Sequence, residues 1–281
     1  MDAEAAGALF EEMTPWLAES YWSWVTQRFT MRPGQGRYSP TAPKAFFNTP
    51  LLREFERTCR IRAEYTGTSL RDGMALLRAR VTAAGAEFRL ADFLVCRVDT
   101  VGVRDRLDLI LREAGSAWAV GMRDGQPGLE RRVPEGVQEA AEAAMRTPGR
   151  AGSRLAEAWR AAYSVSPNPA HSYALAVKAV EDAAIPAVVP RQTDATLGHV
   201  IGQLRRDGDW SLALAREEPT APTTETVLRL CQALWKGHHD RHGGDASAPE
   251  TVDQREAEAA LQIAVFLVHG FASGTISRRP S

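Results

Sequence analysis

The chain has 281 residues, of which 44% are hydrophobic and 25% are charged. These fractions are close to the averages of globular proteins, and they exclude a mainly disordered or fibrous chain. The formal net charge is −1, so the overall charge predicts no polyanionic partner. At this length we expect two domains, because most domains contain about 100–200 residues.

The charge is distributed unevenly. Residues 1–27 include five acidic and no basic residues, whereas residues 28–80 include eleven basic and four acidic ones, a local charge of +7. Aromatic residues, among them Phe29, Tyr38, Phe46 and Phe47, are interleaved with these bases. Arginines interleaved with aromatics suit single-stranded nucleic acid. The alternative, which we favour, is that the aromatics fill a core while Arg53, Arg57 and Arg60 form a solvated helix face.

The cysteine pattern and the N-terminus indicate a cellular compartment. Cys59, Cys96 and Cys231 are scattered and form no CxxC pair, which favours a reducing environment. The acidic N-terminus fits neither a signal peptide nor a transit peptide. The longest apolar run, 259–268, is about half as long as a membrane span. We therefore expect a cytoplasmic protein that does not engage a membrane. The sequence has no phosphate-binding or dinucleotide-binding glycine loop, so we also expect no cofactor.

The first half of the chain has mainly helical periodicity. Thr14 and Pro15 begin an amphipathic helix that extends to about Phe29. Residues 32–43, rich in proline and glycine, predict a loop. We expect further helices at about 51–63, 69–83, 90–98 and 103–113. A short β-hairpin is expected near 117–133, around turns at Asp124-Gly125 and Pro127-Gly128, and Pro134 opens another helix.

The breaker-rich segment 147–152 predicts a domain boundary. We therefore expect an N-terminal helical domain at 1–148, of unknown role, and a C-terminal domain at 152–275. In the second we expect five helices, at about 155–163, 170–184, 195–206, 224–236 and 256–271. The last is apolar nearly all round between 259 and 268, which indicates a central position in a bundle or at a subunit contact.

The segment 235–245 has the highest density of reactive side chains. Three of the six histidines, His238, His239 and His242, lie here beside Lys236 and Arg241. Histidine titrates near neutral pH and acts as acid, base or metal ligand. Lysine and arginine stabilise phosphate-like charge.

Three interpretations of this segment compete. It can be a solvated helix C-terminus whose cations complement the helix dipole. It can be a metal site formed by His238 or His239 with His242 and an aspartate, although Gly237 and Gly243 argue against the helix that this spacing requires. It can also perform metal-independent acid–base chemistry on a phosphodiester, with His242 as base or acid and Lys236 or Arg241 on the phosphate.

Four segments of the chain have an order and spacing that resemble those of a known family. They are AWRAAYSVSPNPAHSYALAVKAVEDAAIPAVVP, ATLGHVIGQL, LWKGHHDRHGG and EAEAALQIAVFLVHGF. Together they resemble the C-terminal domain of bacterial abortive-infection proteins of the actinobacterial type, within the HEPN superfamily. The resemblance covers about residues 154–272, less than half of the chain. It implies a mainly α protein with a C-terminal HEPN-like helical bundle, preceded by a helical domain with one small hairpin.

The family motif is an arginine followed, a few residues later, by a histidine. His242 matches the histidine, and the arginine position falls on Lys236, with five residues between them. A lysine keeps the charge but lacks the bidentate fork of a guanidinium. Either Arg241 has taken over the cationic role, or the protein binds RNA or nucleotide without cutting it. Glu181 matches an acidic position that faces the motif; alternatively it is an exposed helix carboxylate paired with Lys178.

The resemblance implies an antiviral, abortive-infection protein that acts as a metal-independent endoribonuclease. His242, Arg241 and Lys236 would be catalytic, supported by Glu181, His238 and His239. The partners implied are RNA, a second copy joined through the C-terminal bundle, and an antitoxin or phage-derived trigger. The alternative is a non-catalytic HEPN-like module that binds RNA, nucleotide or protein in a defence or toxin–antitoxin system.

Overall fold

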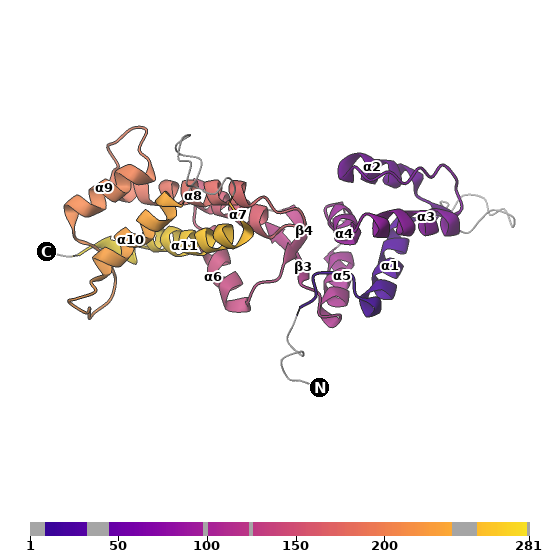
Figure 1. The fold of residues 1–281 in the computed structure, drawn as a ribbon, viewed down its shortest axis with the longest axis horizontal. Helices are drawn as coiled ribbons and strands as arrows, with labels where there is room; N and C mark the ends of the chain where they lie inside the picture. The colour runs from indigo at the N-terminus through magenta and orange to yellow at the C-terminus, as the bar shows by residue number, and fades with distance from the viewer. Residues whose placement is uncertain (1–8, 33–44, 98–100, 124–125, 238–251, 280–281) are drawn as a thin grey trace. The chain divides into compact units, whose positions relative to one another are not determined.

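A computed structural model describes residues 9–32, 45–97, 101–123, 126–237 and 252–279 (Figure 1). Within these residues the chain forms eleven helices and three small antiparallel sheets of two strands each, which confirms the mainly helical class. The chain divides into two compact units, residues 1–132 and 133–281. In the part of the chain that the structure describes, no helix is long and apolar enough to cross a membrane.

The first unit contains five helices and four strands in its described residues. In chain order they are α1 (Pro15–Phe29), β1 (Thr30–Met31), β2 (Phe46–Phe47), α2 (Thr49–Cys59), α3 (Leu70–Ala83), α4 (Glu87–Val95), α5 (Val101–Glu113), β3 (Trp118–Arg123) and β4 (Gln126–Arg131). As the sequence predicts, α1 begins with Pro15 directly after Thr14. Trp22 and Trp24 are buried in the core, whereas Trp16 is 60% exposed.

Two small sheets pack against the helices of this unit. In the first, Thr30 pairs with Phe47 and Met31 with Phe46, a pairing that the sequence analysis did not predict. Phe29 and Phe47 are buried and stack with ring centroids 5.3 Å apart, so these two aromatics of the basic stretch fill the core. The second sheet is the expected hairpin, β3–β4, which packs on α4 and α5. An isolated hairpin is marginal in water, so this support is required. The turn expected at Pro127-Gly128 is wrong, because Pro127 pairs with Met122 and Gly128 with Gly121 inside the sheet.

The second unit is a helical bundle with one small sheet. Its elements are α6 (Glu135–Met145), α7 (Arg150–Tyr163), α8 (Pro169–Val188), α9 (Leu197–Asp207), β5 (Trp210–Leu212), α10 (Thr223–Lys236), α11 (Gln254–Ser273) and β6 (Ile276–Arg278). The helices α7, α8 and α11 pack closely on one another (Figure 1). The central position expected for α11 is confirmed, because Leu261, Ala264, Leu267 and Val268 are fully buried.

The division between the units falls after Arg132, earlier than the segment 147–152 that the sequence indicates. The reason is that α6 packs against α7 and α11 and therefore belongs to the second unit. Residues 147–149 instead form the tight connection from α6 to α7, and Gly152 lies in the first turn of α7. A Cβ atom at Gly152 would collide with the carbonyl oxygens of Met145 and Thr147, so this turn requires glycine.

The strands β5 and β6 were not predicted either. Trp210 pairs with Arg278 and Leu212 with Ile276, which brings the end of α11 beside the loop that follows α9. Arg278 also forms an ion pair with Asp207, at 2.8 Å between Nη2 and Oδ2. Strands of three residues are too short for a recognisable alternation of polar and apolar positions.

Candidate functional site

Two of the six predicted site residues lie in the described part of the chain. Lys236 is the last residue of α10 and is exposed, and Glu181 lies on α8 and is half-buried. The other four, His238, His239, Arg241 and His242, lie outside the described residues. The site is therefore described from the residues around Lys236 and Glu181.

Tyr173 of α8 fixes the end of α10. Its hydroxyl donates to the carbonyl oxygen of Leu234 at 3.0 Å, in a buried position. The last carbonyl groups of a helix have no partner within the helix, so this bond satisfies one of them. Gly237 lies beside the same hydroxyl, and a Cβ atom there would overlap it. The backbone that carries Lys236 is thus held against α8.

The first turn of α9 lies beside Glu181 and beside Trp235, the residue before Lys236. The Leu197 N–H donates to Oε1 of Glu181 at 2.7 Å, so this carboxylate caps the start of α9. On the α10 side, a Cβ atom at Gly198 would come within 3.0 Å of the Trp235 ring. Glu181 and Trp235, the residue before Lys236, therefore contact the same helical turn.

Burial is the main influence on the Glu181 carboxyl. It raises the pKa of Glu181 above its ordinary value of 4.5, and the Leu197 hydrogen bond offsets part of this effect. Asp182 also raises the pKa, while Lys178 and Arg154 lower it. Arg154 of α7 forms an ion pair with Asp182 at 2.7 Å. Glu181 is thus a half-buried helix cap and differs from the exposed carboxylate of the alternative interpretation.

His199 is a further titratable residue at this turn. Its Nδ1 accepts a hydrogen bond from the Thr196 N–H at 3.1 Å, as part of a capping box. A ring nitrogen that accepts an amide hydrogen carries no proton, so the proton of the neutral ring is on Nε2. The side chain is exposed. The spacing of Thr196 and His199 at a helix start was the available signal, because the capping box has this three-residue spacing.

The first turn of α9, Glu181, His199 and the end of α10 with Lys236 are together called the α9–α10 corner below. It combines an exposed imidazole, a carboxyl whose pKa is raised and an exposed ammonium group. Such a set can bind an anion and exchange protons with a bound ligand. The helix N-terminus adds a favourable dipole for negative charge.

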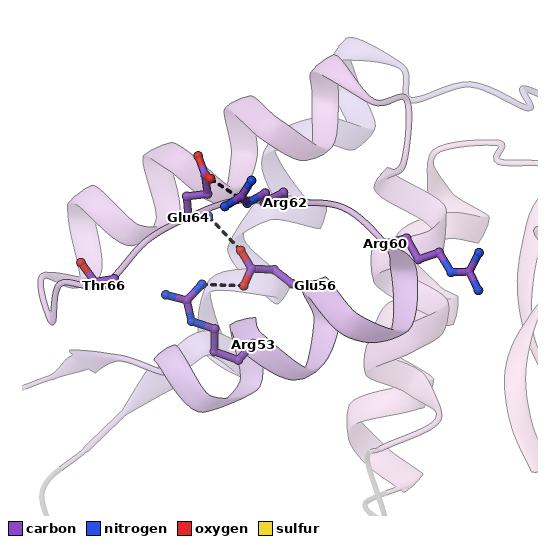
Figure 2. A pocket seen from close by; sticks show the side chains of 6 residues that line it. All are labelled: Arg53, Glu56, Arg60, Arg62, Glu64 and Thr66. Atoms are coloured by element: carbon purple, nitrogen blue, oxygen red, sulfur yellow. Dashed lines mark hydrogen bonds and ion pairs between the residues drawn. The ribbon is translucent and has the colours of Figure 1, made fainter.

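A second candidate is a pocket of about 470 Å³ in the basic stretch of the first unit. Its lining is Arg53, Glu56, Arg60, Arg62, Glu64 and Thr66 (Figure 2). Arg53 pairs with Glu56 at 2.7 Å and Arg62 with Glu64 at 2.6 Å, while Arg60 points away from Glu56. These ion pairs neutralise much of the local positive charge, which makes the pocket a weaker candidate for a polyanion site.

Within the described residues, no group of three or more His, Cys, Asp or Glu side chains is arranged to hold a metal ion. The metal interpretation of His238, His239 and His242 concerns residues outside that range, so it stays a prediction. No protein-family model, curated protein or solved structure matches the chain.

Proposed function

We propose that the second unit binds RNA at the α9–α10 corner and cleaves it without a metal ion. The observation that carries this proposal is that Glu181 and the end of α10, which bears Lys236, contact the same turn of α9. The resemblance to abortive-infection domains assigns a carboxyl and a cation to these two positions. In the sequence, the histidine-rich segment 238–242 follows Lys236 and Gly237.

In this mechanism the neutral imidazole of His242 takes the proton from a ribose 2′-hydroxyl. The 2′-oxygen attacks the adjacent phosphorus in line, and the bond from phosphorus to the 5′-oxygen breaks. Lys236 and Arg241 offset the charge that grows on the equatorial oxygens. A protonated imidazole, His242 of the partner subunit in a homodimer, donates to the leaving 5′-oxygen. The products are a 2′,3′-cyclic phosphate and a 5′-hydroxyl. RNA is required because DNA lacks the nucleophile.

The second candidate function is RNA or nucleotide binding without cleavage. Lys236 favours it, because an ammonium group cannot grip two phosphate oxygens as a guanidinium does. The chain has 31 arginines and only three lysines, so lysine at this position runs against its general usage.

The test is to incubate the full chain with total RNA and with transfer RNA in the presence of EDTA. Cleavage with 2′,3′-cyclic phosphate ends supports the first function, and His242→Ala should abolish it without changing the circular dichroism spectrum. His171→Ala, a change at an exposed histidine of α8, is the matched control and should keep full activity. Cleavage by His242→Ala equal to that of the wild type contradicts the mechanism.

Lys236→Arg separates the two functions. If the corner is catalytic, the guanidinium restores the family motif, and we expect cleavage to rise about tenfold, the effect of about 1.4 kcal/mol. If the corner only binds, RNA affinity changes but no cleavage appears at any enzyme concentration.

In the cell, we propose that RNA cleavage arrests an infected host, with an antitoxin or a phage-derived trigger controlling the activity. Plaque counts on hosts that express the wild type or His242→Ala test this role. If both proteins reduce the plaque count equally, protection does not depend on RNA cleavage, and this role is contradicted.

A further inference from the structure

A pocket of about 480 Å³ lies between α6 and α11 of the second unit, away from the α9–α10 corner. The residues that line it are Gly136, Val137, Ala140, Ala143, Trp159, Gln262, Val265, Phe266, His269, Gly270 and Thr275. Trp159 of α7 is 1% exposed, which places its ring at the base of the pocket. The volume is within the range of small-molecule sites, about 300–1,000 Å³.

The pocket is open because the two helices present side chains of different size. On α6, Gly136, Ala140 and Ala143 are spaced by four and three residues and so share one face. On α11, Gln262 and Phe266 are spaced in the same way. The small side chains of α6 leave the space beside Phe266 unfilled, and Phe266 is 42% exposed.

The C-terminal end of α11 bounds the pocket. Gly270 packs so tightly against Ile276 of β6 that a Cβ atom would overlap the isoleucine side chain. Thr275, in the turn before β6, lines the pocket, and its hydroxyl lies 3.5 Å from the Gly270 carbonyl oxygen. Trp159 thus forms the base of the pocket, α6 and α11 form its two sides, and Thr275 lies at one end.

The lining is apolar apart from a few polar groups. Among the described residues that form it, none is Asp, Glu, Lys or Arg, and the polar side chains are Gln262, His269 and Thr275. Nothing in this lining offsets the charge of a phosphate, so the pocket is unsuited to nucleotides or RNA. An apolar wall with a few convergent polar groups is typical of a site for an uncharged ligand.

We propose that this pocket binds a neutral, largely apolar small molecule with a single hydrogen-bonding head group. The apolar body contacts Trp159, Val265 and Phe266, and the head group bonds to His269 or Thr275, which are exposed at one end of the pocket. The lining covers only seven residue steps of α6, about 10 Å at 1.5 Å per residue. A compact ligand fits this length. The proposal does not depend on the proposed RNA function.

The test uses two probes of equal size that differ in charge, 2-naphthol and naphthalene-2-sulfonate. Binding of each to the full chain is measured by saturation-transfer NMR. We expect 2-naphthol to bind and the sulfonate to bind at least about tenfold more weakly, because the lining contains no Lys or Arg.

Ala140→Leu fills the pocket and should weaken 2-naphthol binding by about tenfold or more. Glu139→Leu adds the same side chain at an exposed neighbouring position outside the lining, and it should bind as the wild type does. Phe266→Ala removes one wall of the pocket and should also weaken 2-naphthol binding. This variant replaces Ala140→Leu in the test if circular dichroism shows that Ala140→Leu is not folded.

Four results would overturn the proposal. They are no binding of 2-naphthol by the wild type, equal binding of both probes, equal weakening by Ala140→Leu and Glu139→Leu, and unchanged binding by the folded pocket variants. Sedimentation at several protein concentrations tests whether a second copy of the chain occupies the pocket instead. If the pocket variants change self-association and leave 2-naphthol binding intact, the face is an interface between copies of this chain.

Discussion

Glu56 and Glu181 both accept hydrogen bonds from backbone N–H groups, yet their pKa values move in opposite directions. Burial raises the pKa of Glu56, but bonds from the Glu64 and Ala63 amides, both at 2.8 Å, and from Arg53 outweigh it, so the pKa is below 4.5. Glu181 receives one amide bond, from Leu197, and burial prevails. Glu56 has more donors to its charged form, and Asp182 adds to the effect of burial on Glu181, so the two pKa values move in opposite directions.

We predict that Glu56→Ala destabilises the first unit by about 1–3 kcal/mol at pH 7, because two loop amides lose their acceptor. The lowered pKa stabilises the fold above the ordinary value of 4.5, and this contribution disappears as the pH falls through the folded-state pKa. Urea unfolding at several pH values measures it. Glu54→Ala, which breaks an exposed ion pair with Arg97, is the control and should cost less than about 1 kcal/mol. An equal cost for both variants would contradict the role given to the amide bonds.

Glu181→Gln should reveal the opposite pH dependence. A raised pKa means that the folded state binds the proton more tightly, so the wild type loses stability as the pH rises from 4.5 through the folded-state value. Glutamine has no such titration. We therefore expect the stability of the wild type minus that of Glu181→Gln to fall across this window, as measured by urea unfolding. A constant difference from pH 4 to pH 7, about the ordinary range of a glutamate and above, would contradict the effect of burial.

At the scale of elements, Gly152 controls how closely α7 can follow α6. A Cβ atom there would meet the carbonyl oxygens of Met145 and Thr147, which belong to the backbone and cannot move without shifting the turn. We predict that Gly152→Ala destabilises the second unit by about 1–3 kcal/mol. Gly136→Ala is the matched control, since Gly136 lies in the first turn of α6 with open space around its Cα. It should be neutral or stabilising by up to about 1 kcal/mol. Thermal unfolding of both variants measures the difference, and equal shifts would disprove the close approach.

The helices were predictable because their signals are local. Pro15 after Thr14, Pro169 after the capping Asn168, and the Asp253–Glu256 capping box each lie within four residues of the helix start they specify. The hairpin β3–β4 was predictable for the same reason, since its turn lies between its own strands. The pairing of β5 with β6 joins Trp210 to Arg278 and has no local signal.

At the scale of the whole molecule, each unit has the contacts of an independent domain. The hydrophobic core of the second unit is built from residues between Ala141 and Ile276, all within that unit. We predict that residues 133–281 fold without the first unit, with cooperative thermal unfolding and a near-ultraviolet circular dichroism signal from their tryptophans. A fragment that begins at 152, after the boundary indicated by the sequence, lacks α6 and should be less stable. Equal stability of the two fragments would contradict the assignment of α6 to the second unit.

The candidate site was predictable only in part. Lys236 at the end of a helix followed from periodicity, and its placement is confirmed. The bond from Leu197 to Glu181 and the contact of Gly198 with Trp235 were not predictable, because they join three helices across 16 and 37 residues of chain.

The sequence by itself determined the mainly helical class, the order of the helices and the hairpin, because helices and tight turns form hydrogen bonds between near neighbours. It did not fix the helix ends: α7, for example, begins at Arg150, five residues before the predicted start. Only the tertiary structure decided that α6 joins the second unit, that Glu181 caps α9 beside the end of α10, and that small side chains on α6 leave a pocket against Phe266. Each of these depends on where packed helices bring distant segments together. That placement results from the burial of apolar faces. Burial is not directional, so the sequence pattern of a helix does not specify which other helix will cover its apolar face.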